Sequence, residues 1–170
     1  GRVSAWSSPA FWGVGLLDRS EWKARWIGCD VDRSAADDPA YLPCPLLRRS
    51  FTTGPQIKRA VVYVTAAGLY ELHINGKRVG RDHFTPGWTE YQKRLYYQAY
   101  DVTSLLRAGK TNVIGAVLGD GWYGLHHHGR GRLARKAQLH IEYDSGRSDV
   151  IATDGRWRVT DRSPLRMSDI

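Results

Sequence analysis

The sequence lacks the features of a membrane-spanning or disulfide-stapled protein. No apolar run approaches the ~20 residues that a membrane-spanning helix needs. The two cysteines, Cys29 and Cys44, fit neither a metal-binding pattern nor a disulfide framework, and their spacing is compatible with a free or a paired state. The first residues show no charged segment followed by an apolar stretch, which is the pattern of a signal peptide. We therefore expect no membrane association, and the sequence is compatible with a cytoplasmic or a secreted protein.

Motifs that carry enzymatic chemistry are also missing. The chain has no G-x-S-x-G nucleophile elbow, no H-E-x-x-H zinc motif, no P-loop and no dinucleotide fingerprint at a strand–helix junction. The segment "LGDGWYG" contains G-x-G, but we expect no helix after its strand and therefore no phosphate site. Spacing alone selects no glycosidase pair among the 17 acidic residues. We expect this chain alone to be non-catalytic.

Phenylalanine is scarce, with 3 residues beside 7 Trp and 9 Tyr. Most aromatic rings therefore carry a polar group, which suits half-exposed binding surfaces, although strands also favour such residues. Acidic residues are outnumbered, and the net charge of +8 indicates an anionic partner as one alternative. The arginines are spread along the chain, however, and the one dense basic run, "GRGRLARK" at residues 129–136, is typical of a solvated loop. A nucleic-acid or polyanion binder is therefore the less favoured interpretation.

Long amphipathic helices are absent, and short strand patterns dominate from residue 46 onward. Residues 69–75, "LYELHIN", alternate in character, which predicts a strand with Leu69, Glu71, His73 and Asn75 on one face and Tyr70, Leu72 and Ile74 on the other. The Asn75-Gly76 pair that follows predicts a tight hairpin, because both residues tolerate positive φ.

One helical turn is the only helix that we expect. The segment "TSLLRAGKTN" begins with Thr103, which can cap a helix, and Gly109 can end it, so the turn is predicted near Ser104–Arg107. Seven or more strands with almost no helix indicate an all-β fold, an antiparallel β-sandwich or jelly roll. Residues 1–45 lack this rhythm and are predicted to form an N-terminal arm and linker, which leaves residues 46–170 for the sandwich.

Two glycine-containing segments combine acids with aromatic rings. In "FTPGWTEY", Pro86-Gly87 predicts a turn with proline in its first central position, followed by Trp88. The segment "GDGWYG" supplies Asp120, Trp122 and Tyr123 between glycines, which permit close approach of a ligand. An acid beside a ring suits a neutral sugar, because the ring stacks on C–H groups and the carboxylate accepts hydrogen bonds from hydroxyls. The alternative is that these rings fill the core.

The histidine cluster His126–His128 has two interpretations. Adjacent residues in a strand point to opposite faces, so three histidines in a row rarely form one metal site. Their position between Gly124 and Gly129 indicates a loop, where a transition-metal site is conceivable. We favour a solvated loop at the rim of a ligand site.

The ordered string "LYELHINGKRVGRDHFTPGWTEYQKRLYYQAYDVTSLLRAGKTNVIGAVLGDGWYG" resembles the N-terminal β-sandwich domain of bacterial α-L-rhamnosidases. The segments "WKARWIG" and "PLLRRSFTT" resemble the start of that domain and "ATDGRWRVTDRSPLRMSDI" its end, so the resemblance covers residues 22–170. The segment "SPAFWGVGLLDRSEW" resembles the end of a fibronectin-like module. Shorter parts are similar to galactose-binding-like jelly rolls of other exo-glycosidases.

The resemblance implies a non-catalytic carbohydrate-recognition domain whose parent enzyme, cytoplasmic or secreted, carries its catalytic acids in an α/α barrel beyond Ile170. Some family members bind terminal L-rhamnose on this sandwich with a calcium ion. Asp82 and His83 occupy the loop where members often have an acidic or Asp-Asn-like pair, but imidazole is a poor ligand for a hard cation. Calcium is thus the one cofactor suggested, with its ligands unassigned.

We predict that the sugar site comprises Asp82, His83, Trp88, Asp120, Trp122 and Tyr123. Its ligand would be L-rhamnose in a glycan or glycoside, and the other partner would be the catalytic domain of the same parent protein. The main alternative is a structural spacer that only packs on the catalytic barrel.

Overall fold

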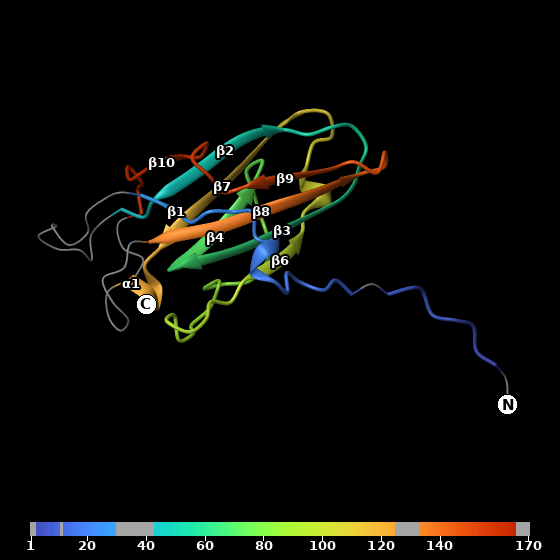
Figure 1. Cartoon of the computed structure of the whole chain (residues 1–170), viewed down its shortest axis with the longest axis horizontal. Helices are drawn as coiled ribbons and strands as arrows, with labels where there is room; N and C mark the ends of the chain where they lie inside the picture. The colour runs from blue at the N-terminus through green and yellow to red at the C-terminus, as the bar shows by residue number, and fades with distance from the viewer. Residues whose placement is uncertain (1–2, 11, 30–42, 125–132, 166–170) are drawn as a thin grey trace, which may run out of the picture.

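The computed structural model describes residues 3–10, 12–29, 43–124 and 133–165. They form two antiparallel sheets packed face to face (Figure 1), which confirms the predicted β-sandwich. Sheet A has the order β1-β8-β3-β6, with β9 also paired to β8, and sheet B has the order β10-β2-β7-β4-β5. The strands are β1 (Ile27–Gly28), β2 (Leu46–Thr52), β3 (Ile57–Ala67), β4 (Leu69–Ile74), β5 (Lys77–Arg78), β6 (Gln98–Asp101), β7 (Thr111–Gly119), β8 (Ala134–Tyr143), β9 (Ser148–Ala152) and β10 (Arg158–Thr160).

The core lies between the sheets because alternate residues of the long strands are apolar. In β4, Tyr70, Leu72 and Ile74 are buried while Glu71 is exposed, as the alternation predicted. Each buried side chain of this size stabilises the fold by ~1.5–3 kcal/mol. The most deeply buried apolar side chains are Val62, Val64, Leu139 and Ile141 in sheet A and Leu72, Ile74, Ile114 and Leu118 in sheet B.

The predicted hairpin joins β4 and β5 and is confirmed. Asn75 and Gly76 adopt φ of 53° and 81°, the left-handed region that the turn requires. The Asn75 side chain also supports the neighbouring strand, because its Nδ2 donates to Asn112 Oδ1 (2.8 Å) and its Oδ1 accepts from Val113 N (3.0 Å). One residue therefore serves both the turn and a buried polar network.

The expectation of a single helix was wrong. The segment η4 (Thr103–Leu105) is a 3-10 turn that starts one residue early, and Thr103 is its first residue rather than its cap. Thr103 Oγ1 accepts from Ala60 N (2.8 Å) and donates to Asp101 Oδ1 (2.7 Å), which ties the turn to β3. Two further segments are η1 (Arg19–Glu21) and α1 (Gly121–Gly124). Elements of three or four residues are too short to show helical periodicity in a sequence.

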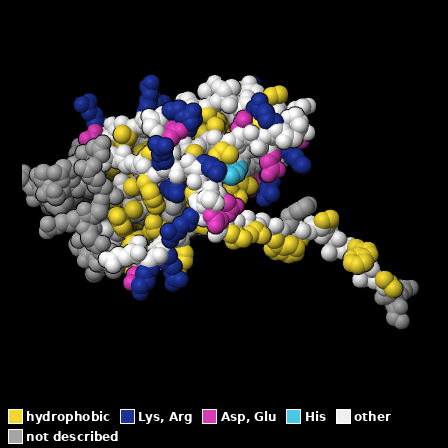
Figure 2. All heavy atoms as spheres, viewed as in Figure 1, with side chains coloured by type: hydrophobic (Ala, Val, Ile, Leu, Met, Phe, Trp, Pro, Cys, Tyr) yellow, Lys and Arg dark blue, Asp and Glu magenta, His cyan; other side chains and the backbone are white. Residues whose placement is uncertain are grey.

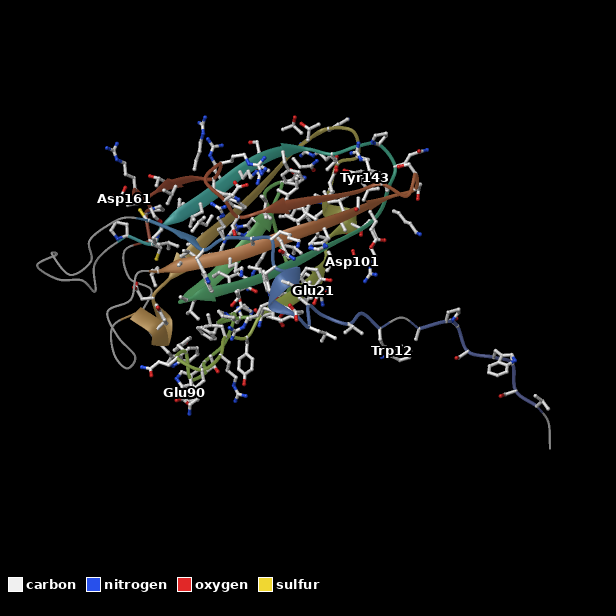
Figure 3. All side chains as sticks on the ribbon, in the orientation of Figure 1. Trp12, Glu21, Glu90, Asp101, Tyr143 and Asp161 are labelled. Carbon is white, nitrogen blue, oxygen red and sulfur yellow. The ribbon has the colours of Figure 1, made fainter. Side chains whose placement is uncertain are left out.

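Residues 19–28, which we expected in the arm, lie against sheet A. β1 pairs with β8, and the buried side chain of Gln138 holds the preceding turn. Its Oε1 accepts from Lys23 N (2.7 Å), and its Nε2 donates to Glu21 O (3.0 Å). Glu21 and η1 accordingly lie beside the sheet in Figure 3.

The described residues upstream of Leu16 extend away from the sandwich (Figure 1). Their apolar rings have no cover there, since Trp6 is 100% and Trp12 87% exposed. Cys29 and Cys44 are free thiols. Among the described residues, none of the helices has the length and apolar character needed to cross a membrane.

Candidate functional site

The loop of residues 79–97 connects the edge strand β5 of sheet B to the edge strand β6 of sheet A. It runs along one side of the sandwich toward α1 (Figure 1). Asp82 is exposed, but its Oδ2 accepts from the Tyr100 hydroxyl (2.7 Å) and its carbonyl accepts from Arg78 Nη2 (2.6 Å). Because Arg78 lies in β5 and Tyr100 in β6, these bonds tie the loop to both sheets.

The Pro-Gly turn in this loop differs from the prediction. Gly87 N donates to Phe84 O (2.9 Å), so Pro86 occupies the second central position rather than the first. The Thr85–Pro86 bond is cis, the geometry of a type VI turn. Thr85 is buried and bonds twice to Tyr70, through Tyr70 N to Thr85 O and Thr85 Oγ1 to Tyr70 O (both 2.9 Å). The turn is therefore held against β4.

A buried polar network supports the turn from beneath. The Tyr70 hydroxyl donates to Gln98 Oε1 (2.7 Å), and Gln98 Nε2 donates to Pro86 O (3.1 Å). Burial raises the pKa of Tyr70 far above its usual value. Burial, reinforced by the hydrogen bond to Asp82, raises the pKa of Tyr100 to about 12. Both phenols consequently stay protonated at neutral pH and act as fixed donors.

The second segment that combines an acid with aromatic rings, "GDGWYG", follows β7 and contains α1. The sequence analysis predicted no helix after this strand. Gly121 makes the turn, with φ of 48°. A Cβ atom there would lie 2.5 Å from Leu69 Cγ, so the position requires glycine for both backbone and space. The tight turn brings the two residues that follow it back toward the loop.

Two aromatic pairs join α1 to the loop. The rings of Phe84 and Trp122 lie 6.3 Å apart between centroids at an angle of 63°, and those of Tyr91 and Tyr123 lie 5.1 Å apart at 80°. Both are edge-to-face contacts of the kind that aromatic pairs prefer. The two segments, separated by about thirty residues of sequence, are thus joined through Phe84, Tyr91, Trp122 and Tyr123. We call these four residues, together with the exposed Trp88 of the same loop, the aromatic edge.

Known proteins share this architecture. Residues 55–170 match the family model of the alpha-L-rhamnosidase N-terminal domain. The chain belongs to this family. An α-L-rhamnosidase from Alteromonas sp. (strain LOR) is 34% identical and is matched over 98% of this chain but only 19% of its own length.

Solved α-L-rhamnosidases contain the same domain. The Streptomyces avermitilis enzyme, crystallised with L-rhamnose, is 43% identical over 71% of this chain and 12% of its own, with a TM-score of 0.67. The Aspergillus terreus enzyme is 33% identical over 92% of this chain and 18% of its own, with a TM-score of 0.80. A Pleurotus ostreatus lectin in complex with GalNAc shares the fold at 18% identity, covering 83% of this chain and 36% of its own, with a TM-score of 0.54. The chain spans less than a fifth of the curated α-L-rhamnosidases that it matches.

Within this rhamnosidase N-terminal domain, the six predicted site residues occupy different environments. Asp82, His83 and Trp88 are exposed, Trp122 and Tyr123 are half-buried, and Asp120 is buried. Trp88 is 56% exposed, which excludes the alternative that its ring fills the core. Asp120, at 3% exposure, is less available to a ligand than its loop position suggested.

The sequence analysis missed Phe84 and Tyr91 as contributors to the aromatic edge. Phe84 is 61% exposed and adopts φ of 55°, a region that bulky residues rarely occupy. The signal available in the sequence was that both residues lie in the segment "FTPGWTEY", on either side of the Pro-Gly turn.

No group of three or more His, Cys, Asp or Glu among the described residues could hold a metal ion. The histidine cluster His126–His128 lies outside the described residues.

Proposed function

We propose that this domain is a non-catalytic carbohydrate-recognition domain of a longer α-L-rhamnosidase. Its ligand is terminal L-rhamnose or a related sugar, bound at the aromatic edge. The rings of Phe84 and Trp88 stack on the C–H face of the sugar, and polar groups of the same loop accept hydrogen bonds from its hydroxyls.

The conformation of Phe84 carries this proposal. A bulky residue in the left-handed region costs free energy, on the order of 1–3 kcal/mol, and such strain clusters at ligand sites. Phe84 combines this backbone with 61% exposure of its side chain. Burial of the ring cannot offset that cost, because most of the ring stays in water. A role outside the stability of the free domain accounts for both observations.

Hydrogen bonds to the two sheets fix the backbone of the loop, and a fixed loop is suited to binding a ligand. Thr85 and Pro86 are buried and bonded to β4 and β6, while Trp88, two residues further along the chain, is exposed. A ring presented from a fixed backbone loses little conformational freedom when a ligand binds. The Streptomyces avermitilis relative in complex with L-rhamnose supports the choice of sugar.

Titration with L-rhamnose tests the proposal. Few apolar atoms and hydroxyl bonds worth about 1 kcal/mol each predict weak binding, on the order of 10 μM to 1 mM. Trp88→Ala should weaken it about fivefold or more, since a stacked ring contributes about 1 kcal/mol, with little change in melting temperature. Trp26→Ala is the matched control, because Trp26 is 45% exposed and adjoins β1 at the opposite edge of sheet A. If the parent domain binds no sugar, the structural spacer replaces this proposal.

We also propose that the parent protein supplies catalysis from a separate domain. The residues before Arg19 would be the tail of a preceding fibronectin-like module, and those between β1 and β2 a linker, while residues 19–28 pack on the sandwich itself. The exposed Trp6 and Trp12 support a neighbour on that side. The isolated chain should release no nitrophenol from an aryl α-L-rhamnoside above the buffer rate. Turnover that a point mutation in this chain abolishes would contradict this assignment.

A further inference from the structure

A basic hollow lies on sheet B, away from the aromatic edge. It has a volume of about 310 Å³ and is lined by Arg48, Arg49, Ser50, Arg156 and Arg158. Figure 2 shows Lys and Arg side chains gathered along the border of the molecule where β2 and β10 lie. Every side chain of its lining is polar, and four of the five are arginines.

Two of these arginines face each other across the strand pair. Arg158 in β10 is directly opposite Arg48 in β2, and like charges at such positions are destabilising. Neither forms an ion pair with a carboxylate among the described residues. Within the described part of the chain this arrangement has no compensating carboxylate, so the pair is available to an added anion.

The other two arginines are held in place by one acid. Asp154 Oδ2 accepts from Arg156 Nη2 (2.6 Å) and Arg49 Nη1 (3.3 Å), and Arg49 Nη1 also donates to Ala152 O (2.8 Å). Hydrogen bonds from Arg156 lower the pKa of Asp154, so this carboxylate is ionised at neutral pH. Four arginines and one aspartate leave the hollow with a formal charge of +3.

The floor beside the hollow is open. Gly115 in β7 lies in register between Arg48 of β2 and His73 of β4, and it contributes no side chain to this row. The His73 ring already has a partner, because its Nε2 lies 3.1 Å from Glu71 Oε1. A ring-sized molecule anchored by Arg48 therefore meets flat backbone rather than a side-chain wall.

The geometry points to an oxyanion site that takes the carboxylate or sulfate group of an acidic saccharide. The guanidinium fork matches such oxyanions with paired hydrogen bonds, and the volume suits one small ligand. A nucleic acid is disfavoured, because no aromatic ring lines the hollow to stack on a base. That the oxyanion is carried by a saccharide rests on the proposed carbohydrate function; the oxyanion chemistry itself does not.

Titration at low salt tests the site with methyl glucuronide, glucose 6-sulfate, glucose and sodium sulfate as probes. The first two arms distinguish carboxylate from sulfate, and we expect at least one to bind ten times more tightly than glucose. The double variant Arg48→Gln, Arg158→Gln should reduce this binding at least tenfold. The double variant Arg59→Gln, Arg81→Gln is the control, because it removes the same charge from exposed positions elsewhere and should leave binding unchanged.

Two outcomes overturn the site: acidic sugars and sodium sulfate all bind no better than glucose, or both double variants weaken binding equally. Binding of sodium sulfate without either acidic sugar would overturn the saccharide assignment and leave the oxyanion chemistry in place. Folding is checked by thermal melts, which should show no loss of stability for Arg48→Gln, Arg158→Gln. L-Rhamnose titration separates the two proposals. The arginine variant should leave rhamnose binding intact, and Trp88→Ala should leave methyl glucuronide binding intact.

Discussion

The two outer faces of the sandwich follow opposite rules. On sheet A, Tyr63, Tyr97 and Trp22 form edge-to-face contacts at 6.3 and 5.6 Å, and the Tyr97 hydroxyl donates to Leu16 O (3.0 Å), so the N-terminal segment covers aromatic rings. On sheet B, Arg48, Ser50 and Thr52 of β2 point outward and are exposed and polar, and Arg48 lies opposite Arg158. Strand alternation builds both sheets equally. The sheets differ in their outward residues. Those of sheet A are covered by the N-terminal segment, whereas those of sheet B remain available to a partner.

The outer face of sheet A, which we call the covered face, is held to the N-terminal segment by buried polar side chains and not by apolar contact alone. Gln138 lies in the middle of β8 with no exposed surface, and it bonds to the backbone of the segment on both its amide oxygen and its nitrogen. The outer face of sheet B, which we call the bare face, has no comparable buried polar side chain in β2, since Ser50 and Thr52 are exposed. We therefore expect that replacing an outward polar side chain by alanine lowers the free energy of unfolding strongly on sheet A and hardly at all on sheet B.

The largest expected effect is that of Gln138→Ala. The change leaves the N–H group of Lys23 and the carbonyl of Glu21 without their partner beneath the segment. A group left unsatisfied costs ~1–3 kcal/mol when buried. Because both bonds are only partly buried, we expect a loss of about 2–3 kcal/mol in the free energy of unfolding. Urea denaturation measures it. Gln92→Ala, at an exposed loop position, should change the free energy by less than about 0.5 kcal/mol. Equal losses in the two variants would remove the distinction between anchored and bare positions.

A second prediction compares a charge inside the sandwich with one on its outer face. Arg135 is fully buried, and its guanidinium nitrogens have no hydrogen-bond partner among the residues that the structure describes. Its Cζ lies 4.4 Å from the ring centroid of Trp157. Burial lowers the pKa of Arg135 to about 9. Arg135→Met should therefore increase the free energy of unfolding by about 1–2 kcal/mol, because removing an unpaired buried charge outweighs the lost cation–π contact.

Arg158→Met is the matched control for this prediction. Its side chain is exposed and faces a like charge, so its removal should change stability by less than about 1 kcal/mol. Melting temperatures of both variants, measured side by side, decide the matter. A marked loss of stability in Arg135→Met would show that the buried guanidinium is stabilising, contrary to our reading of the core.

The sequence predicted features whose cause is local and missed those whose cause is tertiary. Alternation in residues 69–74 and the Asn75-Gly76 pair specify a strand and a hairpin by themselves, and both are present. By contrast, the cover of sheet A by residues 19–28 depends on Gln138, more than a hundred residues away. No local pattern encodes such a partner. The strand rhythm therefore assigned the segment to an arm, and only the family resemblance placed residues 22–28 at the start of the domain.

The candidate sites divide in the same way. Trp88 and Trp122 were selected because each follows a turn signal, whereas Phe84 became visible only through its positive φ and its contact with Trp122. The basic hollow was invisible in the sequence, because Arg48 and Arg158 are 110 positions apart and meet only through the pairing of β2 with β10. The dense basic run at residues 129–136 was interpreted as a solvated loop, but its last residues belong to β8, where Arg135 is buried.

The smallest expected effect is a pH dependence of the covered face. His140 lies under the N-terminal segment, with its ring 5.3 Å from that of Tyr63, and its Nε2 is 2.8 Å from Gln138 Nε2. The amide nitrogen donates, so the imidazole nitrogen accepts and must be unprotonated. Burial lowers the pKa of His140, and the nearby carboxylates of Glu142 and Glu21 oppose that shift only in part.

The sign of the effect follows from these pKa values. Below about pH 6.5, the usual value for histidine, the unfolded chain binds a proton that the folded chain does not. The free energy of unfolding should therefore fall as the pH decreases from 6.5, and level off once the folded-state pKa is passed. The difference between the parent and His140→Gln isolates this contribution, because glutamine can still accept a hydrogen bond from Gln138 without titrating. Urea denaturation at several values between pH 5 and 7.5, with an NMR titration of the His140 ring, measures both quantities. A His140 pKa above 6.5, or an identical pH dependence in the variant, would show that the covered face does not respond to protonation.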